Sequence, residues 1–178
     1  MRFPQLALVV AGTLMCTGCS EMISLHPFVT DGEAVQDARL LGVWVDGSGD
    51  KEPIYIIRQD GNGYTIGRSD NDSPAIYKLK AKMLKVGDAR ILDLTPADED
   101  AFQIAAHTPL RVWLEGATLR MAFLDSKWLR DHASAELAVE QMGDRLLIMS
   151  PQENVTRFLM TYGGDERAYG KITELTRQ

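Results

Sequence analysis

The clearest pattern of apolar and polar positions lies in residues 75–86, AIYKLKAKMLKV. Apolar side chains at every second position, from Tyr77 to Met83, are separated by Lys78, Lys80 and Lys82. A period of two is typical of a β-strand that buries one face and exposes the other. We therefore expect a strand here, with its lysines in solvent.

Short runs of the same kind, separated by tight turns, continue through most of the chain. The sequence Asp60-Gly61-Asn62-Gly63 predicts a hairpin turn between strands at 53–59 and 64–68. Further strands are expected at 40–45, 89–94, 102–107, 110–115, 118–124, 137–141 and 145–150. Roughly nine antiparallel strands in chain order predict a meander, and closure into a barrel would remove its exposed edges.

Two short helices are expected towards the C-terminus. Asp125 is a suitable N-cap for a helix over 126–136, because its side-chain oxygen can accept a hydrogen bond from the first turn. Ser150, followed by Pro151 and an acidic residue, predicts the start of a helix that runs to about Tyr162 and ends at a Gly pair. The expected fold is mainly β: an antiparallel meander that closes into a barrel, with two short helices near the C-terminus.

The first residues have a different pattern. Arg2 precedes an uncharged, mostly apolar run from Leu6 to Met15, and the small residues Thr17 and Gly18 follow. This order is typical of a secretory signal peptide. The apolar run is shorter than the roughly 20 residues that a membrane-spanning helix needs. We therefore expect residues 1–18 to be a signal peptide that is removed.

The run Thr17-Gly18-Cys19-Ser20 resembles the lipobox of bacterial lipoproteins, although Cys16 stands where the box usually has Leu. The resemblance implies cleavage before Cys19, a diacylglycerol on its sulfur and an acyl group on the new amino terminus. Several acyl chains give a stable membrane anchor. Ser20 resembles the outer-membrane default of Gram-negative sorting, so the expected location is the outer membrane, with the domain facing the periplasm.

The rest of the chain has the size of one domain. Residues 19–39 are expected to form the lipidated N-terminus and tether, and residues 40–178 a barrel-like domain around one core. The chain has 19 Lys and Arg against 25 Asp and Glu, a net charge of −6. This balance argues against nucleic acid as a partner and leaves membrane attachment to the lipid on Cys19.

Gly42-Val43-Trp44 on the first expected strand resembles the G-x-W signature of lipocalins, whose Trp packs across the closed end of a barrel. The Arg that stacks on this Trp in lipocalins cannot be placed from the sequence. The chain is also similar to a family of uncharacterised bacterial envelope lipoproteins, at SLHPFVT (24–30), LLGVWV (40–45), LRVWLEGATLRMAFLDSKWL (110–129) and the helix after Ser150. These resemblances imply a lipocalin-like barrel in the cell envelope, and no established activity comes with them.

Patterns for catalysis and metal binding are weak. Asp131, His132 and Ser134 have the residue types of a catalytic triad, but on a helix His132 points about 100° away from the other two. The histidines His26, His107 and His132 are widely separated, and no H-x-x-x-H pair occurs. We expect no enzyme activity, no metal site and no cofactor.

The barrel interior is the remaining candidate site. Its expected lining includes Trp44, Tyr55, Leu79, Val112 and Phe123. These side chains either pack as a filled core, which small barrels favour, or leave a cavity for an apolar ligand. The sequence thus predicts a non-enzymatic binding or assembly module with an apolar ligand or an envelope protein as partner. A lipocalin-like carrier of an apolar small molecule or lipid is the first alternative, and an envelope hydrolase is the second.

Overall fold

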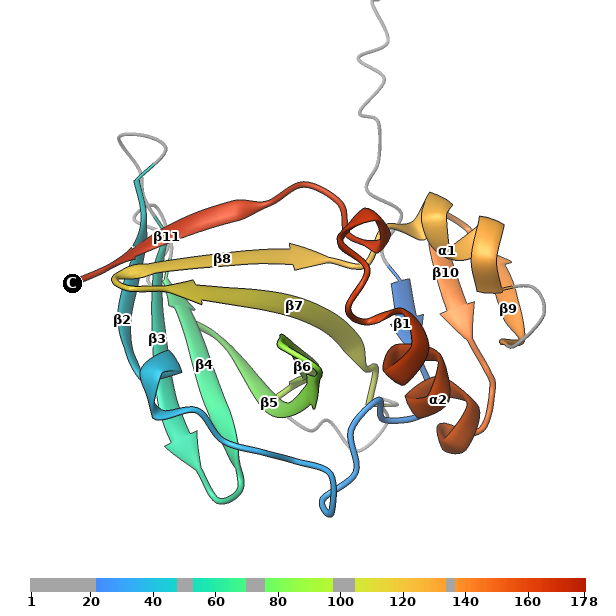
Figure 1. The fold of residues 1–178 in the computed structure, drawn as a ribbon, viewed down its shortest axis with the longest axis horizontal. Helices are drawn as coiled ribbons and strands as arrows, with labels where there is room; N and C mark the ends of the chain where they lie inside the picture. Colours follow the sequence, from blue (N-terminus) through green and yellow to red (C-terminus); the bar gives the residue numbers. More distant parts are fainter. Residues whose placement is uncertain (1–21, 48–52, 70–75, 98–104, 134–136) are drawn as a thin grey trace, which may run out of the picture.

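The computed structural model describes residues 22–47, 53–69, 76–97, 105–133 and 137–178 (Figure 1). Eight antiparallel strands form a closed barrel, so the mainly β barrel expected from the sequence is confirmed. In barrel order they are β11 (Thr173–Arg177), β2 (Gly42–Asp46), β3 (Ile54–Asp60), β4 (Gly63–Ser69), β5 (Ile76–Val86), β6 (Ala89–Pro96), β7 (Thr108–Glu115) and β8 (Thr118–Phe123).

Strands β2 to β8 form the expected meander, in which each strand pairs with the next along the chain. Asp60 pairs with Gly63 around the Gly61-Asn62 turn, as predicted, and Gly61 has a φ of +56°. The strand β11, which closes the barrel between β8 and β2, was not expected. Its sequence, TELTR, lacks an apolar alternation, and only Leu175 is buried.

A second, three-stranded sheet lies outside the barrel. It consists of β1 (Met22–Ser24), β10 (Arg145–Ile148) and β9 (Val139–Met142), with β10 in the middle and parallel to β1. The hairpin of β9 and β10 was expected, but its place in the barrel meander is wrong. The helix α1 (Ser126–Ala133) leads the chain away from the barrel before this hairpin begins.

Two hydrophobic cores lie on opposite faces of the barrel wall. One fills the barrel interior, and the other lies between the outer face of the wall and a layer of β1, β10, α1 and α2 (Gln152–Tyr162). Successive residues of β6 alternate between them, because Ile91 belongs to the outer core whereas Leu92 and Leu94 belong to the interior. Figure 1 shows this outer layer on one side of the barrel.

One of the two predicted helix caps is present. The Asp125 carboxylate accepts a hydrogen bond from the backbone N–H of Trp128 at 2.7 Å, which confirms the cap of α1. The Ser150 cap is wrong, since its hydroxyl instead accepts from the backbone N–H of Ala138 at 2.6 Å, and α2 begins without a side-chain cap. The helix ends at Gly163, where an added Cβ would lie 2.4 Å from Ile91 of the barrel.

The expected tether is part of the fold from Met22 onward. Met22, Phe28 and Val29 are buried, and the 3-10 turn η1 (Ala38–Leu40) leads into β2. The strand expected at 102–107 falls partly outside the described residues, and its described part forms only a single bridge between His107 and Ser24. No helix within the described residues is long and apolar enough to cross a membrane.

Candidate functional site

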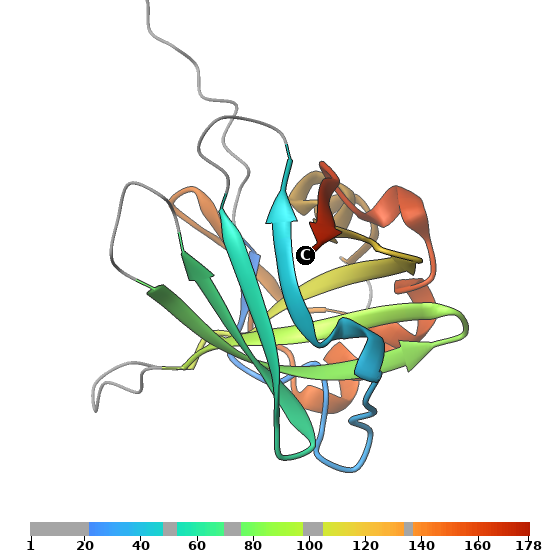
Figure 2. The ribbon, with the colours of Figure 1, turned by 90° about the vertical axis from the view of Figure 1, so that its left-hand side faces the viewer.

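One end of the barrel is closed around Trp44. The turn η1 and the turns at 61–62, 87–88 and 116–117 gather there, and Figure 2 shows β2 running from η1 towards the opposite end. Trp44 is fully buried, and its indole N–H donates a hydrogen bond to the carbonyl oxygen of Leu40 at 2.9 Å. The turn is fixed to β6 because the guanidinium of Arg90 lies 2.8 Å from the carboxylate of Asp37. Hydrogen bonds from Arg39 and then Arg90 hold the pKa of Asp37 well below its usual range.

Arg177, in the last strand, covers the Trp44 ring. Its guanidinium carbon lies 4.4 Å from the ring centre, and the group donates hydrogen bonds to the carbonyls of Leu41, at 3.0 Å, and of Arg39. Gly42 makes room for it: its φ is +140°, and an added Cβ would lie 3.2 Å from Arg177 Nη1. The Gly and the Trp of the G-x-W triplet therefore each have a physical role in closing this end.

The interior side chains are unequally covered along the barrel. In the middle of β7, Val112 is almost completely buried. Near the closed end Leu119 is also buried, whereas its register partner Leu114 and Leu41 are half-buried. We call the other end, which carries the β2–β3, β4–β5 and β6–β7 connections, the open end. There Leu79 is only half-buried.

Phe123, the fifth of the interior residues expected from the sequence, differs from the other four. By strand alternation it lies on the same face of β8 as Leu119 and Met121, but it is 54% exposed and is not a core residue. Trp44 and Val112 are buried in the interior core, and Tyr55 and Leu79 pack against it. Phe123 is the last residue of β8, and the chain turns into α1 soon after it.

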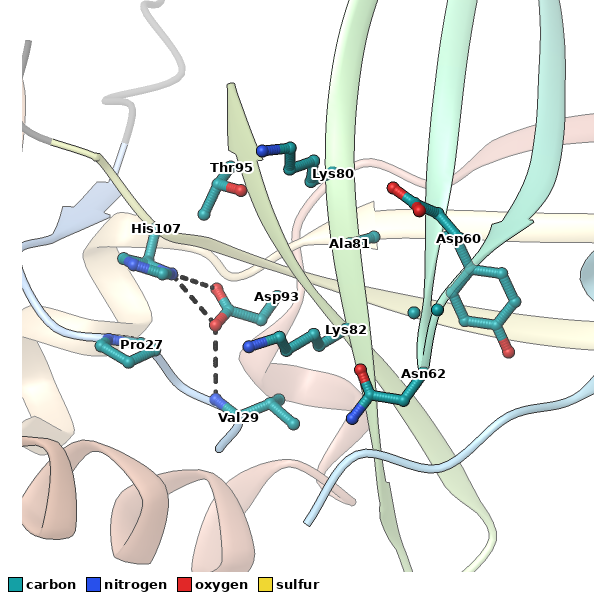
Figure 3. A pocket seen from close by; sticks show the side chains of 13 residues that line it. Pro27, Val29, Asp60, Asn62, Lys80, Ala81, Lys82, Asp93, Thr95 and His107 are labelled. Carbon is teal, nitrogen blue, oxygen red and sulfur yellow. Dashed lines mark hydrogen bonds and ion pairs between the residues drawn. The ribbon is translucent and has the colours of Figure 1, made fainter. Parts of the chain in front are cut away.

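A groove of about 340 Å³ lies on the outer face of the barrel, between β5, β6 and the segment that follows β1 (Figure 3). Lys80 and Lys82 project into it from β5, as the alternation along this strand predicts. The ammonium of Lys82 lies 2.8 Å from the carboxylate of Asp31, which belongs to the same segment. Lysines and carboxylates are therefore mixed in this groove.

Asp93 and His107 meet on the wall of the groove, although 14 residues separate them in the chain. The carboxylate of Asp93 is 3.1 Å from His107 Nδ1 and also accepts hydrogen bonds from the backbone N–H groups of Phe28, at 2.9 Å, and Val29, at 3.3 Å. Asp93 is 3% exposed, and a buried carboxylate needs such partners. The pair thus holds the N-terminal segment on the barrel.

His107 and Asp93 resemble the base and the orienting acid of a hydrolase triad. A complete triad would also need a nucleophile beside His107. Thr95 lines the groove from the same strand face as Asp93. Among the hydrogen bonds of the described residues, none joins a hydroxyl to His107. A triad needs a nucleophile in a hydrogen-bonded row with the base, and the described geometry lacks that row.

The other chemical candidates from the sequence are not brought together. His132 stacks on Trp128 at 4.1 Å between ring centres, and its Nδ1 lies 2.8 Å from the carbonyl oxygen of Trp128. Ser134 and Cys19, the expected lipidation site, lie outside the described residues. Within the described ranges, no three His, Cys, Asp or Glu side chains gather as metal ligands.

A buried cation that the sequence analysis missed fixes α2 to the barrel. Arg111 on β7 is 6% exposed, and its guanidinium donates to the carbonyl oxygens of Gly164, at 3.0 Å, and Gly163, at 3.4 Å. It lies 4.5 Å from the ring centre of Trp113 and 5.2 Å from that of Tyr169. Burial raises the pKa of Tyr169 to about 12. No sequence motif marks this cluster, because its members come from three separate segments.

In comparisons with known proteins, no family model, curated protein or solved structure matches the chain.

Proposed function

We propose that this protein is a bacterial envelope lipoprotein, anchored through Cys19 to the outer membrane, whose barrel binds an apolar small molecule or an acyl chain at its open end. The proposal combines the lipobox-like run before Ser20 with a non-enzymatic binding role for the barrel. It favours the lipocalin-like carrier over a purely structural role in an envelope assembly.

The observation that carries the proposal is the difference between the two barrel ends. Trp44, Arg177 and η1 cover the interior at one end. At the other, the interior face presents half-buried Leu79 and the exposed ring of Phe123. Ligand sites are concave and mostly apolar, and the mouth of a β-barrel is one of their preferred places. An apolar chain that entered here would contact side chains that the fold leaves only half-covered.

Binding can be tested on the full chain with Cys19→Ala, which we expect to accumulate in the periplasm without lipid. The probe is a dansylated undecanoic acid, whose fluorescence rises in an apolar site. Leu79→Trp adds bulk on the interior face of β5 and should weaken probe binding by about tenfold or more, or roughly 1.4 kcal/mol. Lys78→Trp, on the outer face one residue away, is the matched control and should leave the affinity unchanged.

Two results would count against the carrier. One is an unlipidated protein that does not bind the probe and shows a bare mass by native mass spectrometry. The other is equal binding by the Leu79→Trp and Lys78→Trp variants, which would place the probe outside the barrel. Either result would favour a filled barrel and direct the search to a protein partner.

A further inference from the structure

The described fold begins very close to the proposed anchor. Met22 is already the first residue of β1, so only Ser20 and Glu21 separate it from Cys19. A chain spans at most about 3.6 Å per residue, which places a lipid on Cys19 within about 11 Å of Met22 in any conformation of the connection. This step rests on the lipid anchor proposed above.

Met22 lies at the open end of the barrel. Its carbonyl oxygen accepts a hydrogen bond from the Thr108 hydroxyl at 3.3 Å, and Ser24 forms a bridge with His107. Thr108 is the first residue of β7, which runs from the open end towards the turn at 116–117. Figure 1 shows β1 on the opposite side of the barrel from the C-terminus, which lies at the closed end. The anchor is therefore attached beside the open end.

The barrel rim next to this attachment point carries exposed apolar side chains. Leu110, two residues into β7, pairs with Phe123, whose carbonyl oxygen accepts a hydrogen bond from the backbone N–H of Gly170 at 3.0 Å. Met22 contacts β7, and β7 pairs with β8, so Phe123 lies one strand beyond the strand that Met22 contacts. Phe123 is 54% and Ile172 47% exposed.

The same rim also carries an exposed lysine, Lys171, and a hollow. Lys171 is exposed and follows Gly170 directly. Together with Ile172 it lines a hollow of about 500 Å³ that extends to the end of β2 at Asp46 and Gly47. We use the name mouth rim for Phe123, Lys171 and Ile172.

We propose that the mouth rim docks on the bilayer that holds the anchor. An aromatic ring and an aliphatic side chain next to a lysine suit the boundary between headgroups and acyl chains. The net charge of −6 gives no general attraction to anionic lipid, so the short connection supplies the proximity and the apolar side chains supply the contact. The closed end, with Arg177, then points away from the membrane, and an acyl chain can pass between bilayer and barrel without crossing water.

The test uses the full-length lipoprotein, purified from membranes and placed in phosphatidylethanolamine–phosphatidylglycerol vesicles that contain a nitroxide on some headgroups. Acyl mass and flotation with the vesicles are checked first. A single fluorophore is attached at Ile172→Cys on the rim or at Asp88→Cys in the turn at the closed end, the sulfur of Cys19 being occupied by lipid. We expect the nitroxide to quench the rim probe at least about twofold more than the closed-end probe, since docked side chains lie within 5–10 Å of the headgroup boundary.

A longer connection separates docking from mere tethering. With about 20 Gly and Ser residues inserted after Glu21, the domain can rotate freely. The excess quenching at position 172 should persist in this variant and should disappear when Phe123→Ser is added.

Three outcomes would overturn the docking surface while leaving the anchor intact: equal quenching of both probes, loss of the excess through the longer connection alone, or crosslinking of the rim to an envelope protein in place of lipid quenching. A protein without acyl mass that does not float with vesicles would instead refute the anchor itself.

Discussion

Replacement of Arg177 by Met should lower the free energy of unfolding, because this side chain covers the closed end of the barrel. The variant keeps an unbranched apolar stem, and it leaves the backbone hydrogen bonds of the strand in place, such as the one from the Arg177 N–H to the carbonyl oxygen of Ala117. What it removes is the charge over Trp44 and the donors to the carbonyls of Leu41 and Arg39.

The magnitude follows from these contacts. A cation over an aromatic ring contributes about 1 kcal/mol when it is partly exposed. The two hydrogen bonds involve a charged donor, but Arg177 is exposed and water can replace it at the carbonyls, so we assign them about 0.5 kcal/mol each. The sum is about 2 kcal/mol. With a urea m-value of about 2 kcal/mol/M, the midpoint should fall by about 1 M.

The assay is urea unfolding of the Cys19→Ala protein, followed by far-ultraviolet circular dichroism. Arg167→Met is the matched control, because Arg167 pairs with Asp165 at 2.8 Å on the surface and such pairs contribute less than about 1 kcal/mol. Arg177→Lys keeps the charge but not the planar fork, and should lie between the wild type and Arg177→Met. A midpoint of Arg177→Met equal to that of Arg167→Met would refute the role assigned to the closed end.

Four further outcomes are expected. Trp44→Ala should destabilise the protein by about 3–5 kcal/mol in the same assay, and an unchanged midpoint would remove Trp44 from the core. Asp93→Ala leaves the backbone N–H groups of Phe28 and Val29 without their acceptor, so it should lower the free energy of unfolding by about 3 kcal/mol and speed hydrogen exchange at both residues. The control Asp88→Ala, in an exposed turn, should change neither quantity. Because the pKa of Tyr169 is raised, stability should fall between pH 10 and 12, and the urea midpoint of Tyr169→Phe should vary less over that range. Cys19→Ala should move the protein from the membrane to the soluble fraction, and retention at high salt would contradict the anchor.

The sequence predicts the barrel wall well, because its strands carry a local signal. Alternation in β5 and turn residues such as Gly61 lie within a few positions of one another, so they are visible without knowledge of the fold. The helix α2 ends at Tyr162, as expected, and begins at Gln152, one residue after the expected first helical position, Pro151. What fails is the assignment of strands to sheets: β9 and β10 have ordinary strand sequences, and nothing local indicates that they join β1 instead of the barrel.

Residues of the candidate sites are harder to predict because their partners are distant in the chain. Arg177 meets Trp44 only after β11 has closed the barrel, and its strand has a mostly polar sequence. Asp93 meets His107 only through the pairing of β6 with β7. Ser150 has the residue type of a helix cap, but its hydroxyl accepts a hydrogen bond from the backbone N–H of Ala138 instead. In each case tertiary pairing decides a contact that composition and spacing leave open.

The position of β11 at the end of the chain has a consequence for biogenesis. Strands β2 to β8 precede it, and the whole outer layer of α1, β9, β10 and α2 is inserted between β8 and the strand that completes the ring. Until residues 173–177 emerge, β2 and β8 are two unpaired edges of an apolar sheet, which is the arrangement most prone to strand addition by other chains. Closure also requires pairing between Arg177 and Trp44, over a long sequence separation that slows folding. A chain shortened by its last strand would therefore expose two unpaired sheet edges to other chains, so proteolysis should remove C-terminally truncated copies first.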